Sequence, residues 1–273
     1  MEITLGIAMT KHMIDYQIFA EKLYETALEA GRKIMAVYAK DFTVHYKEDT
    51  SPVTEADEAA EAIILRDLKE VAPDIPIIAE EQASSGNIPE VADIFWLVDP
   101  LDGTKEFIKK GSDFTVNIAL IENKQPSFGI VYAPALGRMF VAKGPKHAVQ
   151  MDISEGRFIG TEKPISVRDV PANGITAVAS KSHRDSQTDA FLEKLGVTDI
   201  VGAGSSLKFC LVAAGEADIY PRFGPTMEWD TGAGHAVLKA AGGTVVNPDG
   251  TDFCYQKPEF RNGFFIANGK VVF

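Results

Sequence analysis

Five acidic residues stand directly after short apolar runs, at places where buried strands would end. They are Glu80 and Glu81 after residues 76–79, Asp99 and Asp102 after residues 95–98, and Asp230 after Trp229. Ligands of open α/β sheets gather at the carboxyl ends of strands, so these carboxylates can converge from distant parts of the sequence. Hard oxygen ligands in this number suit Mg²⁺ better than a soft transition metal.

The segment 99–104 reads D-P-L-D-G-T and concentrates this chemistry. Pro100 fixes its own φ and stiffens the chain, so Asp99 and Asp102 can present two carboxylates to the same point. The intervening carbonyl of Leu101 can serve as a further ligand. A calcium-binding EF-hand loop counted from Asp99 fails, because its required glycine and its final glutamate fall at the wrong places.

Taken singly, the acidic residues also have structural explanations. Asp102 and Gly103 form a strong turn signal. Asp230 could cap a helix, and Asp57 has the spacing of a capping-box acid after Thr54. The joint pattern is not ordinary turn chemistry, and it favours a cation site over separate turns and caps.

The elements that would position these residues can be read from the apolar pattern. Phe19, Leu23, Ala27, Ala30, Ile34 and Val37 recur at helical spacing, and a second helix runs from Thr54 to the residue before Pro73. Strands are predicted at 75–79, 95–98, 115–121, 128–132 and 139–142. Residues 111–142 alternate strands and turns like an antiparallel meander, and residues 143–170 are expected to be further strand and loop.

After Pro171 the pattern changes to alternating strands and helices, which is typical of an α/β arrangement. Strands are predicted at 175–179, 217–220 and 244–246, and helices at 188–195, 206–214 and 231–241. A boundary near residue 165 divides the chain into an N-terminal α+β domain, 1–165, and a C-terminal α/β domain, 166–273. The first domain would carry most of the acidic residues named above.

Composition limits the class of partner. The 27 Lys and Arg against 39 Asp and Glu give a net charge of −12, which argues against a nucleic-acid polymer. An acidic protein that binds an anion needs cations at the site, often metal ions. The 45% of hydrophobic residues is ample for a packed core.

The two cysteines and the N-terminal residues indicate in which cellular compartment the protein is expected. Cys210 and Cys254 lack a C-x-x-C spacing and a neighbouring histidine cluster, so we expect reduced, packed thiols in a cytoplasmic protein and no zinc site. No run of 18 apolar residues predicts a membrane span. The short apolar run near the N-terminus precedes its basic residues, unlike a secretory signal, and residues 1–12 are interpreted as a loose leader.

Longer motifs carry a resemblance to a known family. VDPLDGT at 98–104 and EWDTGAGHAVLKAAGG at 228–243 resemble the lithium-sensitive, magnesium-dependent phosphatase superfamily of inositol monophosphatases and fructose-1,6-bisphosphatases. SPVTEAD at 51–57, FTVNIAL at 114–120, SKSH at 180–183 and the segment 204–231 resemble the CysQ-type 3′(2′),5′-bisphosphate nucleotidases within it. The similarity covers the chain from about residue 14 to its end. It implies a layered αβαβα sandwich, with most of the metal ligands in the first domain and the nucleotide-binding residues in the second.

The resemblance implies a catalytic site with two or three Mg²⁺ ions. The metal ligands would be Glu80, Asp99, the carbonyl of Leu101, Asp102 and Asp230. The pair that activates the attacking water would be Asp57 and Thr104. Such residues suit metal-assisted hydrolysis of a phosphate monoester, in which metal ions lower the pKa of water and stabilise the leaving oxygen.

The implied substrate is adenosine 3′,5′-bisphosphate, cleaved to AMP and phosphate, with 3′-phosphoadenosine 5′-phosphosulfate as a second substrate in sulfur assimilation. Lys208 and Arg222 would hold the phosphate that does not react. The full set of implied substrate-binding residues is Glu80, Leu101, Asp102, Gly103, Thr104, His183, Ser205, Lys208, Arg222 and Asp230. Plainer interpretations remain for two of them, since His183 could be a packed or surface histidine and Lys208 a solvent-facing lysine.

Two other functions stay open. One is an inositol-phosphate or sugar-phosphate monoesterase, and the other is a catalytically silent Mg²⁺-dependent nucleotide-binding protein. The segment GAGSSL at 202–207 lacks the third glycine of a dinucleotide fingerprint, and the chain has no phosphate-binding P-loop sequence. The resemblance favours a monomer and leaves a dimer and a peripheral position on the inner membrane open.

Overall fold

The computed structural model describes residues 15–47, 52–180 and 185–273. The helices are α1 (Tyr16–Tyr38), α2 (Glu55–Val71), α3 (Glu80–Ser84), α4 (Thr104–Ile108), α5 (Ser186–Leu195), α6 (Leu207–Ala213), α7 (Glu228–Ala240) and the short 3₁₀ helix η1 (Pro258–Phe260). The strands of the large sheet are β3 (Ile77–Ala79), β4 (Ile94–Asp102), β5 (Thr115–Glu122), β6 (Gln125–Ala133), β7 (Arg138–Ala142), β8 (Ala148–Ser154) and β9 (Arg157–Pro164). The remaining strands are β1 (Val44–Tyr46), β2 (Pro52–Thr54), β10 (Thr176–Ser180), β11 (Asp199–Ala203), β12 (Ile219–Arg222), β13 (Thr226–Met227), β14 (Thr244–Val246), β15 (Arg261–Asn262) and β16 (Phe265–Asn268).

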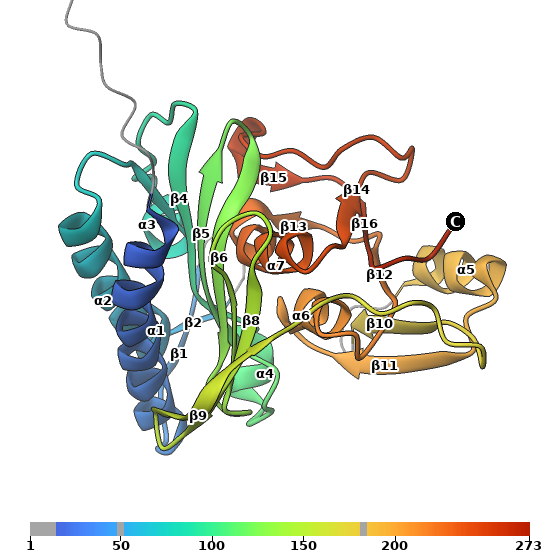
Figure 1. Ribbon diagram of the computed structural model, residues 1–273. Helices are drawn as coiled ribbons and strands as arrows, with labels where there is room; N and C mark the ends of the chain where they lie inside the picture. The colour runs from blue at the N-terminus through green and yellow to red at the C-terminus, as the bar shows by residue number, and fades with distance from the viewer. Residues whose placement is uncertain (1–14, 48–51, 181–184) are drawn as a thin grey trace, which may run out of the picture.

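These elements form five layers (Figure 1). Helices α1 and α2 cover one face of the large sheet, and α6 and α7 separate its other face from a second sheet. The second sheet has the order β11-β10-β12-β16-β14, and α5 packs on its far side. The predicted layered αβαβα sandwich is therefore confirmed.

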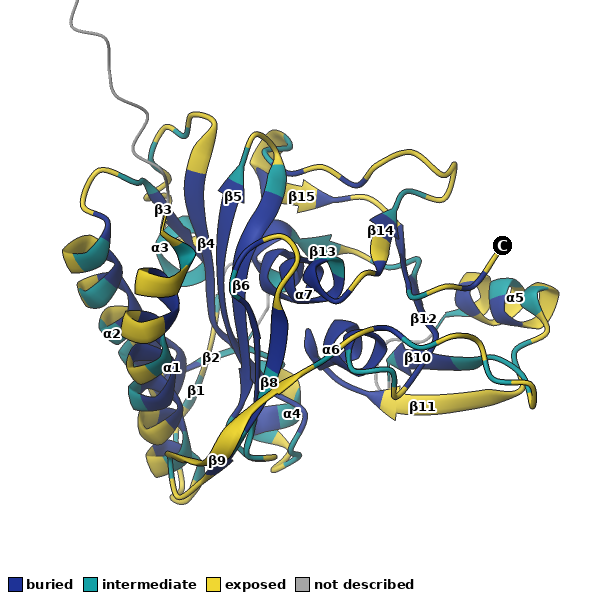
Figure 2. Ribbon diagram, viewed as in Figure 1, coloured by how far each residue is buried: buried dark blue, intermediate teal, exposed yellow. Residues whose placement is uncertain are grey.

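Strand β4 is buried along nearly its whole length because both of its faces are covered by helices (Figure 2). Trp96 and Val98 join the core under α1 and α2, and Phe95 and Leu97 join the core under α7. A strand buried on both faces has a continuous apolar run rather than alternation, which is the pattern that residues 95–98 show.

The prediction that this strand ends at Val98 is wrong. β4 continues to Asp102, and its pairing with β5 shifts register between Asp99 and Asp102. Pro100 lies inside this irregular stretch and has no N–H to donate to the ladder. The strand therefore bulges where the two aspartates stand instead of stopping before them.

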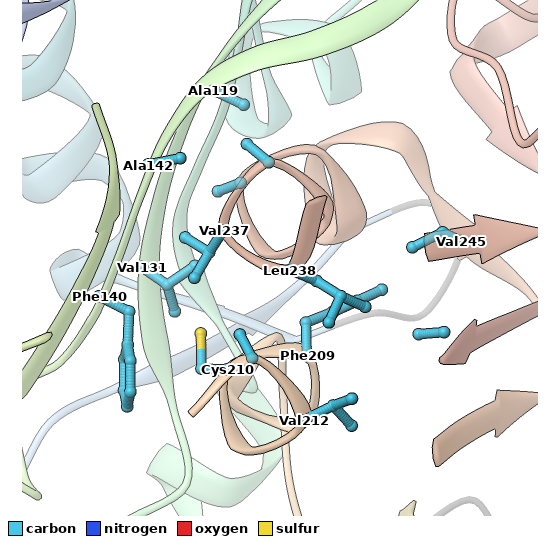
Figure 3. Packing of buried hydrophobic residues seen from close by; sticks show 14 of the residues in the cluster. Ala119, Val131, Phe140, Ala142, Phe209, Cys210, Val212, Val237, Leu238 and Val245 are labelled. Atoms are coloured by element: carbon cyan, nitrogen blue, oxygen red, sulfur yellow. The ribbon is translucent and has the colours of Figure 1, made fainter. Parts of the chain in front are cut away.

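Helix α7 lies close against the large sheet because small residues face each other across the contact. A Cβ added to Gly129 on β6 would lie 2.8 Å from the carbonyl oxygen of Ala233 and 2.8 Å from the Cβ of Ala236. Val237 and Leu238 of α7 pack among Val131 of the sheet and Phe209 of α6 (Figure 3). This packing fixes the N-terminal turn of α7 at the end of β4.

Several predicted boundaries need correction. Helix α7 begins at Glu228 rather than residue 231, so Asp230 lies in the first turn and is not the residue that precedes the helix. Strand β12 covers Ile219–Arg222 rather than 217–220, and α5 begins at Ser186. The meander is confirmed, and residues 143–170 contain β8 and β9.

The sequence did not predict the short elements β1, β2, α3, α4, β11, β13, β15 and β16. Each has five residues or fewer, too few for a strong periodic signal.

The predicted boundary near residue 165 falls in the connection between β9 and β10. One apolar core nevertheless contains residues of both sheets, such as Phe140 and Val178, so the division into two domains stays a prediction. In the parts of the chain that the structure describes, no helix is long and apolar enough to cross a membrane.

Candidate active site

A cavity of about 270 Å³ opens at the end of β4, between the starts of α4, α6 and α7 and the end of β12. Its wall includes ten of the predicted site residues, namely Glu80, Asp99, Leu101, Asp102, Gly103, Thr104, Ser205, Lys208, Arg222 and Asp230. Asp57 lies behind the wall and contacts Thr104. His183 lies outside the described residues.

Asp99 is the most enclosed carboxylate of this cavity, with 1% of its surface exposed. Burial raises its pKa well above the usual range, and the nearby charges of Glu80, Asp102 and Asp230 raise it further. One of its oxygens, Oδ1, accepts a hydrogen bond of 3.0 Å from the backbone N–H of Leu101. Asp230 has a strongly raised pKa as well, first through burial and then through Asp102 and Glu80.

Asp102 is held from the C-terminal half of the chain. Its Oδ2 accepts hydrogen bonds from the hydroxyl of Ser205 at 2.6 Å and from the backbone N–H of Ser206 at 2.7 Å. Burial raises the pKa of Asp102, while these two donors and the charge of Lys208 oppose the rise. Ser205 has a φ of 57°, in the left-handed region, so the backbone there is strained.

Asp57 and Thr104 come together although 47 residues separate them. Thr104 donates from its hydroxyl to Asp57 Oδ1 at 3.1 Å, and the same hydroxyl lies 3.1 Å from the Leu101 carbonyl. The other oxygen, Asp57 Oδ2, accepts from the N–H and the hydroxyl of Thr54, which completes the predicted capping box of α2. Burial raises the pKa of Asp57 to about 6, against the lowering effect of Thr54.

Glu80 and Glu81 lie in the first turn of α3, and both form an ion pair with Lys47. Nζ of Lys47 lies 2.8 Å from an oxygen of each glutamate. Burial and the neighbouring Glu80 raise the pKa of Glu81 to about 7. Glu61 of α2 accepts hydrogen bonds from the N–H groups of Glu81 and Gln82 and so caps this short helix.

Two cations, Lys208 and Arg222, line the same cavity. Lys208, predicted on a plainer interpretation to face solvent, is 4% exposed and donates from Nζ to the carbonyl of Ser205 at 2.6 Å. Burial lowers the pKa of Lys208 to about 8, and the charge of Arg222 adds to this effect. Arg222 donates to the Pro225 carbonyl at 3.3 Å, and its buried Nε has no hydrogen-bond partner among the described residues.

The carboxylates suit a hard divalent cation by their chemistry, because several buried acids repel one another and raise one another's pKa. Over the described part of the chain, however, no group of three or more His, Cys, Asp or Glu side chains is gathered tightly enough to hold a metal ion. Lys47 engages Glu80, Ser205 engages Asp102, and the N–H of Met227 engages Asp230 at 2.8 Å. In the structure, each of these three carboxylates is thus held by a protein donor.

Several residues of this site were not predicted. They are Lys47 and Glu61, which hold α3, and Thr115, Asn117 and Ser206, which stand behind Asp102. Asn117 belongs to the motif FTVNIAL, a polar residue inside an apolar strand, and that signal could have identified it. Lys47 and Glu61 occur in polar stretches that give no such signal.

Comparison with known proteins decides the family. A model of the "Inositol monophosphatase family" matches residues 15–270. The chain belongs to this family. Its members depend on metal ions. The chain is 46% identical to the "3'(2'),5'-bisphosphate nucleotidase CysQ" of Salmonella typhimurium. The match covers 90% of this chain and 98% of the relative.

Other relatives match this chain over nearly its whole length, and two of them are solved structures with the same fold. The protein of the same name from Escherichia coli K12 is 44% identical, over 90% of this chain and 98% of its own. The crystal structure of CysQ from Bacteroides thetaiotaomicron superposes with a TM-score of 0.77 at 36% identity, covering 93% of this chain and 98% of that one. The Thermotoga maritima IMPase superposes with a TM-score of 0.74 at 26% identity, covering 94% and 93%.

Proposed function

We propose that this protein is a Mg²⁺-dependent 3′(2′),5′-bisphosphate nucleotidase that hydrolyses adenosine 3′,5′-bisphosphate to AMP and phosphate. The observation that carries the proposal is that one cavity is lined both by the carboxylates and by two cations, Lys208 and Arg222. The names of the relatives at 44–46% identity support the same substrate class.

The carboxylates, with the cations that they would hold, would receive the phosphate that reacts. Glu80, Asp99, the Leu101 carbonyl, Asp102 and Asp230 are the oxygen donors that would hold two or three Mg²⁺ ions. Bound there, Mg²⁺ supplies positive charge and lowers the pKa of coordinated water. The cations also resolve the conflict between an anionic substrate and a protein of net charge −12.

Asp57 and Thr104 would move the proton. The Thr104 hydroxyl lies 3.1 Å from both Asp57 Oδ1 and the Leu101 carbonyl, so it can orient a water beside it while Asp57 accepts the proton. The two hydrogen bonds from Thr54 fix Asp57 Oδ2 and leave Oδ1 turned to Thr104. Asp57 must be ionised to act, and its pKa of about 6 places it close to the working range of a general base.

Lys208 and Arg222 would hold the phosphate that does not react. The buried Nε of Arg222 has no described partner and needs an acceptor, and a guanidinium can bind phosphate through two parallel N–H groups. Lys208 lies between Ser205 and the ring of Tyr220, with Nζ 5.0 Å from the ring centre. A substrate with a single phosphate would leave the buried Nε of Arg222 without an acceptor, which disfavours inositol 1-phosphate.

Steady-state hydrolysis of adenosine 3′,5′-bisphosphate and inositol 1-phosphate with Mg²⁺ tests the proposal. A higher kcat/KM on the bisphosphate is expected, and a higher value on the inositol ester contradicts the assigned substrate. Asp102→Asn should abolish phosphate release while nucleotide binding survives. A folded wild type that binds the nucleotide with Mg²⁺ but releases no phosphate would identify a silent binding protein instead.

A further inference from the structure

A row of polar side chains leads from Asp102 into the large sheet. The Ser205 hydroxyl lies 2.6 Å from Asp102 Oδ2 and 2.5 Å from the Thr115 hydroxyl. The Thr115 hydroxyl lies 2.8 Å from that of Ser206, which lies 2.6 Å from Oδ1 of the Asn117 carboxamide. Thr115, Asn117 and Ser206 are all at most 1% exposed.

These distances form four consecutive contacts, and each needs one hydrogen between its two polar atoms. The three hydroxyls of Ser205, Thr115 and Ser206 supply three hydrogens. An ionised Asp102, the form that binds a cation, supplies none. If the oxygen of Asn117 faces Ser206, one contact of 2.5–2.8 Å is left without a hydrogen. The row then has an acceptor at each end and cannot be satisfied.

Rotating the Asn117 carboxamide by 180° supplies the missing hydrogen, so that each of the four contacts has one. Its NH₂ group then donates to Ser206, Ser206 to Thr115, Thr115 to Ser205, and Ser205 to Asp102. The rotation also removes a defect, because the buried Nδ2 of Asn117 otherwise has no partner among the described residues. Oxygen and nitrogen of a carboxamide have nearly the same shape, so the exchange needs no repacking.

We propose that Asn117, Ser206 and Thr115 are positioning residues that form a one-directional hydrogen-bond relay from Asn117 to Asp102 Oδ2 and thereby reserve Oδ1 for the cation. The relay and the N–H of Ser206 meet the same oxygen. Aligned hydrogen bonds in a buried row strengthen one another, and partners behind a metal ligand fix its orientation. The inference rests on the proposed function, since it assigns these residues to a cation site.

The relay also connects the two sheets. Thr115 and Asn117 belong to β5 of the large sheet, whereas Ser205 and Ser206 stand between β11 and α6. Ser205 keeps a left-handed backbone, with φ at 57°, in the position where its hydroxyl bridges Asp102 and Thr115. The orientation of a carboxylate on β4 thus depends on residues from the far side of the cavity.

The test compares two substitutions of the central hydroxyl. Thr115→Val removes the hydroxyl and keeps the shape, and Thr115→Ser keeps the hydroxyl. Ser127→Ala is the matched control, because Ser127 is a buried hydroxyl of the same sheet that contacts the Leu120 carbonyl. Mg²⁺ binding is measured by calorimetry and by the Mg²⁺-dependent rise in Tm, with kcat at saturating Mg²⁺ alongside.

Thr115→Val is expected to weaken Mg²⁺ binding about 10-fold, the lower end of the range for loss of a partner behind a metal ligand, because Thr115 acts on Asp102 through Ser205. Thr115→Ser and Ser127→Ala should bind Mg²⁺ within about threefold of wild type. Equal Mg²⁺ binding by Thr115→Val and wild type overturns the relay alone. A folded wild type that binds no Mg²⁺ overturns the proposed function and the relay with it. A neutron structure with bound Mg²⁺ should show a deuterium on Asn117 Nδ2 that points to the Ser206 hydroxyl. If Oδ1 of Asn117 faces the Ser206 hydroxyl instead, the direction of the relay is overturned.

Discussion

Replacing Asp57 by Asn separates the two tasks that this side chain performs. Asp57 Oδ2 caps α2 through Thr54, and Oδ1 accepts from Thr104. An asparagine can keep its oxygen toward Thr54 and preserve most of the cap, but it cannot accept a proton from water through Thr104. We therefore expect a well-folded protein in which kcat falls about 10²- to 10⁴-fold, or about 3–5 kcal/mol in the barrier.

The effect of the same substitution on stability follows from the pKa. Burial raises the pKa of Asp57 from 3.8 to about 6. The folded state therefore binds the proton more tightly than the unfolded state, and the free energy of unfolding falls by about 3 kcal/mol as pH rises through this window. Asn carries no charge and removes this cost, while a weakened cap costs about 1 kcal/mol. At pH 7.5 without Mg²⁺, the variant should be at least as stable as wild type.

Thr54→Val is the matched control, because it removes the capping hydroxyl but keeps the backbone N–H bond that orients Asp57 Oδ2 and the contact between Asp57 and Thr104. It should lower stability by about 1–2 kcal/mol with kcat changed less than about threefold. The assay is phosphate release from adenosine 3′,5′-bisphosphate between pH 4.5 and 9, with Tm measured for each variant.

Wild-type kcat/KM should fall as pH drops through about 6 or below, since bound Mg²⁺ favours the carboxylate, and Asp57→Asn should lack this limb. Normal kcat in Asp57→Asn, or an unchanged acidic limb, refutes the assignment of Asp57 as the base.

Four further outcomes are expected. Lys208→Met should raise KM for adenosine 3′,5′-bisphosphate about 10- to 100-fold and hardly change KM for adenosine 3′-monophosphate, with Lys109→Met as a neutral control; equal effects on both substrates would contradict binding of the second phosphate. Burial lowers the pKa of His235 to about 3, so between pH 6.5 and pH 3 the unfolded state binds a proton that the folded state does not. The free energy of unfolding should therefore fall by about 1.4 kcal/mol for each pH unit below 6.5. Denaturant unfolding of His235→Gln should show a weaker dependence on acid pH. Gly129→Ala should cost about 1–3 kcal/mol in unfolding free energy, because its methyl group would meet the Ala233 carbonyl at 2.8 Å; an unchanged Tm would show that α7 can shift freely. Lithium in the millimolar range should inhibit phosphate release, as the family resemblance implies, and full activity would count against the family site.

Local sequence predicted the elements and the donor set better than it predicted their detailed geometry. The capping box at Thr54 and the apolar strand before Asp99 are short-range patterns, and the structure contains both. The bulge of β4 depends on the pairing of Asp99 with Asn117 and of Asp102 with Thr115 across the ladder. No local pattern contains that information.

The contacts around the acidic residues show the same limit. Lys47 reaches Glu80 across 33 residues, and Ser205 reaches Asp102 across 103. Lys208 has the sequence context of an exposed helical lysine, yet tertiary packing buries it to 4%. The roles assigned to the cavity residues as metal ligands and substrate contacts stay predictions, because they concern a bound state.

A crystal structure with Mn²⁺ in place of Mg²⁺ and with AMP and phosphate tests the central claim most directly, because anomalous scattering locates the ions. The proposed function predicts ions bound by Glu80, Asp99, Asp102 and Asp230, with the 5′-phosphate of AMP against Lys208 and Arg222. Ions bound away from these carboxylates, or a nucleotide that leaves Lys208 and Arg222 without contact, would contradict it.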